Sequence, residues 1–207
     1  MYRDYKVYFN DSYLLVTSDS SQINKNFSKV LSNEAETNYF FKRPDVLFDG
    51  VSNGNIIAIC NKPGEVLCQF MEQVEIVIAG GGLVTNEYDE LLLIHRRGKW
   101  DMAKGKIEMN EDIMAGAVRE VEEETGVKIE TVQDKPIHTY HAYTLKGKRC
   151  LKETCWYYMQ ARLGQSNLIP QTEEGIDDVR WVKKDDLPNY RSGCYLLVWD
   201  LLALIST

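Results

Sequence analysis

The chain has 207 residues, of which 44% are apolar and 27% are charged, a composition typical of a globular protein with a buried core. This length allows one domain with additions or two small domains. The formal net charge of −7 argues against a protein that binds polyanions by long-range attraction, so we expect no nucleic-acid partner. The five cysteines include no CxxC pair, which argues against a disulfide framework or a zinc finger and favours a reducing compartment.

Neither an export signal nor a membrane anchor is expected. Residues 1–10 contain no apolar stretch that leads to a small-residue cleavage site. The longest apolar segment, residues 195–205, is interrupted by Asp200 and is shorter than the roughly 20 residues that span a bilayer. These patterns predict a cytoplasmic protein with no membrane partner.

The first 72 residues predict a small α/β unit with no motif that carries chemistry. The strand-like segments YKVYFN and YLLVTS are separated by a polar Asp-Ser pair, which is typical of a β-hairpin. The segment NIIAIC, residues 55–60, is typical of a buried strand. Asn61 followed by Pro63 predicts the start of a helix, with Asn61 as its N-cap.

From residue 73 onward the sequence is typical of strands and turns that surround one acidic helix. Glycines 80–82 lie in a strand-like segment, and no Gly-Lys-Ser/Thr follows them. Close backbone packing in a strand is therefore favoured over a phosphate-binding loop. Later strands are predicted at residues 136–145, 151–163 and 178–182. The apolar residues of segment 193–205 predict a packed terminal helix.

The segment GKIEMNEDIMAGAVREVEEETGV, residues 105–127, predicts a loop, a helix and a second loop. Asn110 is a suitable N-cap for a helix beginning at Glu111, and Gly126 is a suitable residue to end it. At about 100° per residue, the apolar side chains of this helix fall on one continuous arc, which predicts the buried side.

Three glutamates lie together beside that arc: Glu120, Glu123 and Glu124. Like charges three or four residues apart repel by about 0.2–0.5 kcal/mol per pair, and the helix dipole also disfavours anions in the last turns. Arg119 cannot neutralise all of them, whereas a divalent cation can. Oxygen-only ligands favour Mg²⁺ or Mn²⁺, and Gly116 would leave room for the site. A solvated acidic helix face is the alternative.

The spacing of the whole segment favours the metal site. The segment matches every position of the Nudix box: Gly105, five residues, Glu111, seven residues and then REVxEExGV. At ordinary residue frequencies such a match arises by chance on the order of once in 10⁷ chains. The chain therefore resembles the Nudix hydrolases over about residues 73–207, and residues 1–72 remain as a small α/β domain of unknown role.

The resemblance implies an α/β fold, an α/β/α sandwich with a mixed sheet, to which the small N-terminal α/β unit is added. It also implies a hydrolase that uses water and Mg²⁺ or Mn²⁺ to cleave a pyrophosphate bond in a nucleoside diphosphate-linked substrate. By box position, the resemblance makes Glu120, Glu123 and Glu124 metal ligands. It makes Arg119 the residue that orients them and Glu111 a supporting carboxylate, so that the catalytic set is Glu124, Glu120, Arg119 and Glu111.

Three further residues are candidates outside the box helix. Lys104 would contact substrate phosphate; it belongs to a cluster of cations that comprises Arg96, Arg97, Lys99, Lys104 and Lys106. Tyr143 lies where dinucleoside polyphosphate hydrolases of the family carry a tyrosine, and it would stack on a base; an ordinary strand aromatic is the alternative. Glu174, in an acidic loop, is the second choice for the proton acceptor after Glu124 or Glu120.

The favoured substrates are dinucleoside polyphosphates and nucleoside triphosphates. Nucleotide sugars and diphosphoinositol polyphosphates are alternatives within the same class. Outside that class, a ligand-sensing regulator with a Nudix-like module and a structural module with an incidental acidic helix are also possible. The expected partner is a small-molecule nucleotide, and a homodimer is compatible with the sequence.

Overall fold

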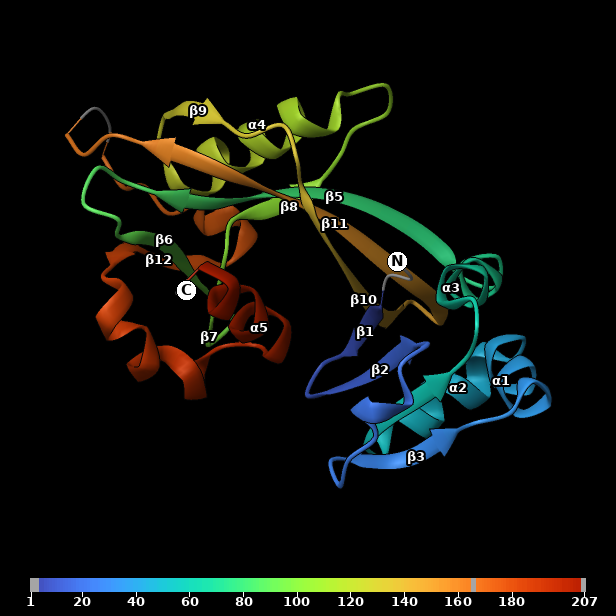
Figure 1. Ribbon diagram of the computed structural model, residues 1–207. Coiled ribbons are helices and arrows are strands. Elements are labelled where there is room, and N and C mark those ends of the chain that lie inside the picture. The colour runs from blue at the N-terminus through green and yellow to red at the C-terminus, as the bar shows by residue number, and fades with distance from the viewer. Residues whose placement is uncertain (1–3, 165–166, 206–207) are drawn as a thin grey trace. The chain divides into compact units, whose positions relative to one another are not determined.

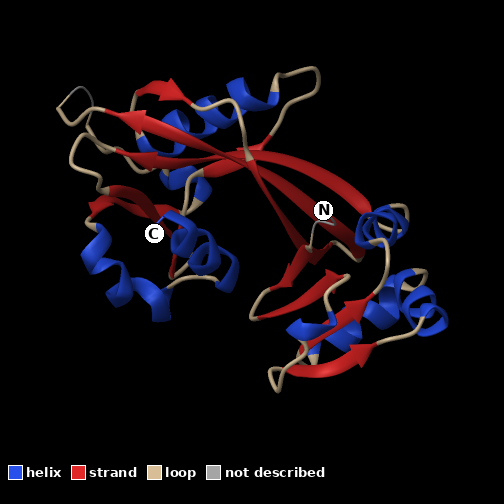
Figure 2. Ribbon diagram, viewed as in Figure 1, coloured by secondary structure: helices blue, strands red, loops and turns tan. Residues whose placement is uncertain are grey.

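The computed structural model describes residues 4–164 and 167–205 (Figure 1). Backbone contacts divide the chain into two compact units, each with helices and strands (Figure 2). The N-terminal unit is Met1–Val77 with Tyr140–Lys152, and the C-terminal unit is Ile78–Thr139 with Glu153–Thr207. The domain boundary that we predict after residue 72 falls near the end of the first of these segments.

The N-terminal unit is built on one sheet. In chain order its own elements are β1 (Tyr5–Phe9), β2 (Ser12–Thr17), the 3-10 helix η1 (Ser20–Gln22), β3 (Phe27–Leu31), α1 (Glu34–Phe41), α2 (Pro44–Ser52), β4 (Asn55–Ile59) and α3 (Pro63–Met71). The strands pair in the order β1-β2-β4-β3. β1 and β2 form the predicted antiparallel hairpin, whereas β2, β4 and β3 run parallel. Tyr140 of β10 (Ile137–Leu145) pairs in parallel with Val7 of β1.

Helices α1, α2 and α3 cover one face of this sheet. Phe41, Leu47 and Phe70, one from each helix, share a buried cluster with Leu14 of β2 and Ile56 of β4. Because alternate residues of a strand face opposite sides, these contacts place all three helices on the same side. The N-terminal unit therefore has a buried core, to which Tyr140, Ala142 and Leu151 also contribute.

Helix α3 starts one residue later than its predicted cap implies. Pro63 is its first residue, and Lys62 occupies the cap position without a side-chain hydrogen bond. The predicted N-cap role of Asn61 is therefore wrong. Proline is suited to the first helical position because its φ is already helical and its missing N–H would be unpaired there. The side chain of Asn61 instead lines a cavity.

The C-terminal unit contains the acidic helix. Its elements are β5 (Glu75–Thr85), β6 (Leu91–Arg96), β7 (Lys99–Asp101), β8 (Lys104–Lys106), α4 (Ile113–Thr125), β9 (Ile129–Val132), β11 (Lys148–Ala161), η2 (Thr172–Glu174), β12 (Ile176–Val182), η3 (Lys184–Gly193) and α5 (Leu196–Ile205). Strands β5, β10 and β11 contribute residues to both units. The strands of this unit follow the order β12-β6-β5-β11, with β7 paired to β6, β8 to β5 and β9 to β11.

Helices lie on both faces of these strands. Ile94 of β6 belongs to a cluster with Val121 of α4, whereas the adjacent Leu93 belongs to a cluster with Leu201 of α5. Adjacent strand residues point to opposite faces, so α4 and α5 cover opposite sides. This helix–sheet–helix arrangement, with parallel and antiparallel pairs in the structure, confirms the predicted α/β class.

The glycines of β5 allow α4 to approach the sheet closely. A Cβ on Gly80 would lie 2.8 Å from Cβ of Ala117, and a Cβ on Gly82 would lie 2.8 Å from Cγ2 of Val121. Both distances are too short for a real side chain. Close backbone packing, predicted for glycines 80–82, is confirmed.

The predicted terminal helix is α5. It begins at Leu196 and not at the predicted residue 193, since Gly193 is the last residue of η3. Its buried residues Val198, Leu201 and Leu202 pack into the second cluster of this unit. Within residues 4–164 and 167–205, no helix has both the length and the apolar character needed to cross a membrane.

A buried hydrogen bond links β10 and β11 in the core of the C-terminal unit. Trp156 is fully buried, and its indole Nε1 donates to Oγ1 of Thr139 at 2.8 Å. Thr139→Val keeps the side-chain shape but leaves the indole N–H unpaired, so we expect the free energy of unfolding to fall by about 1–3 kcal/mol. Thr144→Val, at an exposed position of the same strand, is the control and should change it by less than about 0.5 kcal/mol. Urea denaturation followed by tryptophan fluorescence measures both, and equal losses would contradict the role of this bond.

Candidate active site

Helix α4 (Figure 1) is the box helix, and it begins at Ile113. Its N-cap is Asp112, which has an extended backbone and accepts a first-turn backbone N–H at 3.0 Å. The predicted start at Glu111, with Asn110 as N-cap, is therefore wrong. Asn110 has a φ of 67°, a left-handed conformation that asparagine tolerates in turns, whereas an N-cap requires an extended backbone.

Helix α4 ends before Gly126, as its sequence predicts. Gly126 follows the last helical residue with a φ of 74°, the left-handed conformation that commonly ends helices. The carbonyl of Thr125 accepts the N–H of Ile169 at 2.8 Å, and that of Glu124 accepts the N–H of Gln171 at 3.2 Å. Backbone hydrogen bonds from a second loop therefore fix the turn that carries Glu124.

Arg119 connects three carboxylates of the box. Its Nε and Nη2 donate to the two carboxyl oxygens of Glu111, at 2.7 and 3.0 Å, while its Nη1 donates to Glu120 and Glu123, each at 2.9 Å. These bonds lower the pKa of Glu111 to about 2 and raise the pKa of Arg119. Gly116 makes room for the pair, since a Cβ there would lie 2.8 Å from the Glu111 carboxyl carbon.

Glu120 lies against the backbone of β8. Residue Gly105 of β8 pairs with Gly80 of β5, and a Cβ on Gly105 would overlap the Glu120 carboxyl group. The Glu120 side chain is only 16% exposed, and burial raises its pKa although Arg119 opposes the shift. The box glycine is therefore required for this position of the carboxylate.

Glu124 is the most deeply buried carboxylate of the box helix, with 2% of the residue exposed. Its Oε2 accepts the backbone N–H of Lys104 at 2.9 Å, and its Oε1 lies 3.7 Å from Nη1 of Arg96. Burial raises the pKa of Glu124 to about 7, against the opposing influence of Lys104 and Arg96. A buried carboxyl group with a raised pKa is typical of functional sites.

Two residues outside the predicted site, Arg96 and Asp101, complete the network. Arg96 donates from Nε to the carbonyl oxygen of Glu174 at 2.9 Å and from Nη2 to its carboxylate at 2.7 Å. Buried Asp101 accepts from Nζ of Lys104 at 2.6 Å. Arg96 belonged to the predicted cation cluster, but no local pattern marks Asp101. The structure thus brings Lys104 and Glu174 close to Glu124, each held by an oppositely charged partner.

Tyr143 belongs to the N-terminal unit. Its ring stacks on that of His141 with the centroids 5.5 Å apart, and Nζ of Lys152 lies 5.8 Å from the Tyr143 centroid. Burial raises the pKa of its hydroxyl. Its proposed stacking on a base stays a prediction.

The acidic residues of the box are chemically suitable metal ligands, but their side chains are not arranged as a preformed metal site. Within residues 4–164 and 167–205, no three His, Cys, Asp or Glu side chains are grouped as a metal centre. Glu120, Glu123 and Glu124 nevertheless supply only oxygen ligands, which Mg²⁺ and Mn²⁺ prefer. Burial raises the pKa of Glu120 and Glu124, so a nearby cation would stabilise their charged forms. That these three side chains bind such a cation stays a prediction.

The raised pKa of Glu124 predicts a pH-dependent stability in the presence of a chelator. The folded state binds this proton more tightly than the unfolded chain, so the stabilisation is complete below the unfolded pKa of 4.5 and is lost as pH rises through about 7. The loss is at most about 3 kcal/mol between pH 4.5 and 8. Denaturation curves across this range should therefore show a smaller loss for Glu124→Gln than for the wild type. Glu173→Gln, at an exposed position, should follow the wild type; the same loss in Glu124→Gln would contradict the prediction.

Comparison with known proteins supports the assignment of residues 105–127 as a Nudix box. A NUDIX domain model matches residues 77–194. The chain is 32% identical over 133 residues to the m7GpppN-mRNA hydrolase dcap-2 of Caenorhabditis elegans, a match that covers 62% of this chain and 16% of that protein. It is 42% identical over 57 residues to Nudix hydrolase 8 of Arabidopsis thaliana, covering 24% of this chain and 15% of that protein. The chain thus spans about a sixth of the length of these curated relatives.

Solved structures of similar proteins include an Ap4A hydrolase of C. elegans in a binary complex, 20% identical with a TM-score of 0.46, which covers 61% of this chain and 93% of that one. A NUDIX-family hydrolase from Clostridium perfringens is 17% identical with a TM-score of 0.49, covering 64% of this chain and 97% of that one. The family model spans more than half of the 207 residues, and the complete box runs from Gly105 of β8 through α4 to Val127. This chain belongs to the Nudix family.

Proposed function

We propose that this protein is a Mg²⁺- or Mn²⁺-dependent hydrolase that cleaves a pyrophosphate bond in a dinucleoside polyphosphate or a nucleoside triphosphate. The observation that carries the proposal is a pair of box carboxylates held against the backbone: Glu124, which is buried, against Lys104, and Glu120, which is partly buried, against Gly105. Membership of the Nudix family supports a divalent cation as the cofactor.

Glu120, Glu123 and Glu124 are the proposed metal ligands. When bound, the cation would neutralise phosphate charge and lower the pKa of a water molecule. Arg119 keeps Glu120 and Glu123 in place through its Nη1. Glu111 in turn holds the guanidinium in a bidentate pair, a geometry that fixes orientation as well as charge. Arg119 and Glu111 are therefore positioning residues.

In the proposed reaction, the oxygen of water forms a bond to phosphorus while the bond from phosphorus to the bridging oxygen breaks. Both products leave as phosphates, and the proton of the water passes to a carboxylate. Glu124 or Glu120 is the first choice for that carboxylate, because both belong to the proposed ligand set, next to which the attacking water would be bound. Glu174 is the second choice, since Arg96 already neutralises it.

The substrate assignment rests on residues outside the box helix. The relative dcap-2 is named as a hydrolase of m7GpppN-mRNA, a formula in which phosphates join two nucleosides, and this supports dinucleoside polyphosphates. Lys104 would contact phosphate and Tyr143 would stack on a base. Nucleotide sugars and diphosphoinositol polyphosphates are the alternatives within the class.

A substrate panel tests the proposal on the full chain. Diadenosine tetraphosphate, m7GpppG, ATP, GTP, UDP-glucose and a diphosphoinositol polyphosphate are incubated with Mg²⁺, with Mn²⁺ or with a chelator, and the products are identified by mass. We expect products from at least one of the first four compounds, and none with chelator. Cleavage of UDP-glucose or the inositol compound alone would overturn the substrate assignment, and no cleavage of any compound would overturn the hydrolase.

The alternative function is a ligand-sensing regulator, which the separate N-terminal unit favours. A nucleotide that raises the melting temperature but is not cleaved would support it. A purely structural role for the acidic helix is eliminated if the wild type binds Mn²⁺ and Glu120→Gln does not. The five free cysteines support the proposed cytoplasmic location, and light scattering on the same preparations tests for a homodimer.

A further inference from the structure

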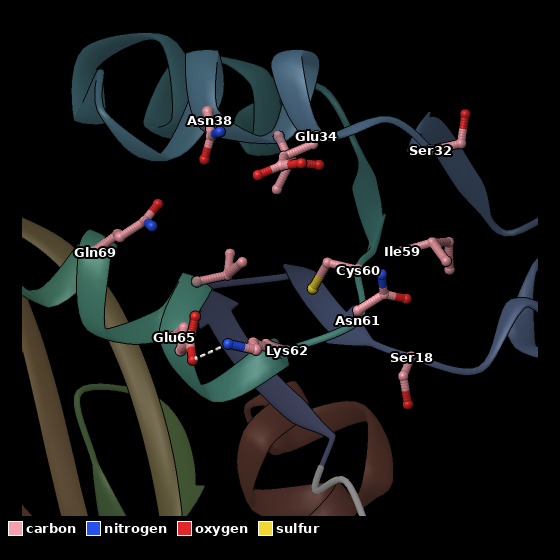
Figure 3. Close-up of a pocket in the computed structure, with 12 residues that line it drawn as sticks. Ser18, Ser32, Glu34, Asn38, Ile59, Cys60, Asn61, Lys62, Glu65 and Gln69 are labelled. Carbon is pink, nitrogen blue, oxygen red and sulfur yellow. Dashed lines mark hydrogen bonds and ion pairs between the residues drawn. The ribbon is translucent and has the colours of Figure 1, made fainter.

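A cavity of about 480 Å³ lies within the N-terminal unit, at the carboxyl ends of its parallel strands. Ser18 follows β2, Ser32 follows β3 and Cys60 follows β4, and all three line the cavity (Figure 3). Helices α1 and α3 both begin at this edge of the sheet. Ligands of α/β proteins characteristically bind outside the carboxyl ends of the strands, so this is where a binding site is expected.

The wall of the cavity is rich in hydrogen-bonding groups. Glu34 and Asn38 of α1 lie across the cavity from Cys60 and Lys62, and Gln69 projects from α3 at one end (Figure 3). Oε1 of Gln69 is the one buried side-chain nitrogen or oxygen without a hydrogen-bond partner in the part of the chain that the structure describes. Buried polar atoms in native proteins nearly always have a partner. Gln69 is only partly buried as a residue and lines the cavity, so a turn of its side chain would bring this oxygen to a donor group of a bound molecule.

The charges of the wall argue against a phosphate ligand. Glu34, Glu65 and Lys62 give the lining a net charge of −1, and Nζ of Lys62 is already paired with Oε1 of Glu65 at 2.7 Å. Glu34 and Glu65 lie in the first turns of α1 and α3, where the helix dipole attracts anions. Their negative charge at these helix starts therefore opposes the binding of a phosphate.

We propose that this cavity binds an uncharged, hydroxyl-rich ligand of nucleoside size, a function beyond the proposed hydrolysis. The side-chain amides of Gln69, Asn38 and Asn61 would pair with hydroxyl and N–H groups of the ligand. Ile59 and Val66 supply the apolar part of the wall, against which a ring can pack. The volume lies within the range of about 300–1,000 Å³ typical of small-molecule pockets.

The probes are adenosine, guanosine, cytidine and uridine, each compared with its 5′-monophosphate by calorimetry on the full chain with chelator present. We expect at least one nucleoside to bind with a Kd below about 1 mM and its monophosphate to bind at least tenfold more weakly. Gln69→Leu should weaken nucleoside binding by about tenfold or more. Gln73→Leu, an exposed glutamine just beyond α3, should bind within about twofold of the wild type.

Cysteine alkylation locates the bound nucleoside without any substitution. Cys60 lines the cavity and Cys68 is exposed outside its lining. Saturating nucleoside should therefore slow iodoacetamide labelling of Cys60, but not of Cys68, as measured by peptide mass spectrometry. The proposal is overturned if no nucleoside binds, if the monophosphates bind as tightly, or if Cys60 is not protected. It is also overturned if Gln69→Leu folds and binds like the wild type, or if Glu124→Gln abolishes binding, because the ligand would then occupy the hydrolytic site.

Discussion

Replacing Glu124 by glutamine is expected to lower kcat by about 10³-fold or more. The substitution removes the charge that would bind a cation and the base that would accept a proton. It keeps an oxygen that can accept the backbone N–H of Lys104, the bond that measures 2.9 Å in the wild type, so the fold should persist. Steady-state kinetics with Mg²⁺ on the best compound of the panel measures the loss, and circular dichroism checks the fold.

Glu122→Gln is the matched control for this substitution, because it makes the same chemical change on the same helix. Glu122 pairs with Lys128 at 2.6 Å and takes no part in the Arg119 network. Its kcat should stay within about threefold of the wild type. Turnover of Glu124→Gln at the level of Glu122→Gln would show that Glu124 neither binds the metal nor accepts the proton.

Gly105→Ala is expected to lower kcat by at least about 10²-fold, although glycine has no functional group. The new Cβ would overlap the Glu120 carboxyl group, so the carboxylate must move away from β8. Displacing a reacting group or ligand by about 1 Å can cost that much rate. We expect the affinity for Mn²⁺, measured by electron paramagnetic resonance, to fall as well.

A double-mutant cycle tests whether Gly105 acts through Glu120. In a Glu120→Ala background the short side chain removes the overlap, so adding Gly105→Ala should change kcat by less than about threefold. Losses that multiply in the double variant would instead show that the glycine acts through another contact. Stability of all three variants is followed by thermal unfolding, because a distorted β8 would lower it in both backgrounds.

Much of the candidate site was predictable because it lies within 23 consecutive residues. Gly105, Glu111, Arg119 and the three glutamates are related by helical spacing and a short loop, and local conformation depends on nearby residues. The apolar arc of α4 and the close packing of glycines 80–82 follow from the same local patterns. The cap of α4 was misplaced by two residues, because both Asn110 and Asp112 are suitable caps and only the backbone conformation distinguishes them.

The neighbours of the box could not be predicted from local patterns. Asp101 reaches the site because β7 pairs with β6, which places Asp101 opposite Ile94. Arg96 contacts Glu174 because β12 also pairs with β6. This pairing places Ile176, two residues after Glu174, opposite Arg96. Such pairings join residues far apart in the sequence, and they depend on which apolar faces are buried together.

The 207 residues alone were enough to show a box helix, an acidic face and the family that carries them, since each depends on spacing along one segment. Other properties arise only when distant segments pack. These include the burial that raises the pKa of Glu124, the membership of Tyr140–Lys152 in the N-terminal unit and the cavity at the ends of β2, β3 and β4. The physical reason is that burial and strand pairing depend on contacts between distant segments. The entropic cost of bringing these segments together and the free energy gained by burying their apolar surface cannot be read from a local sequence pattern.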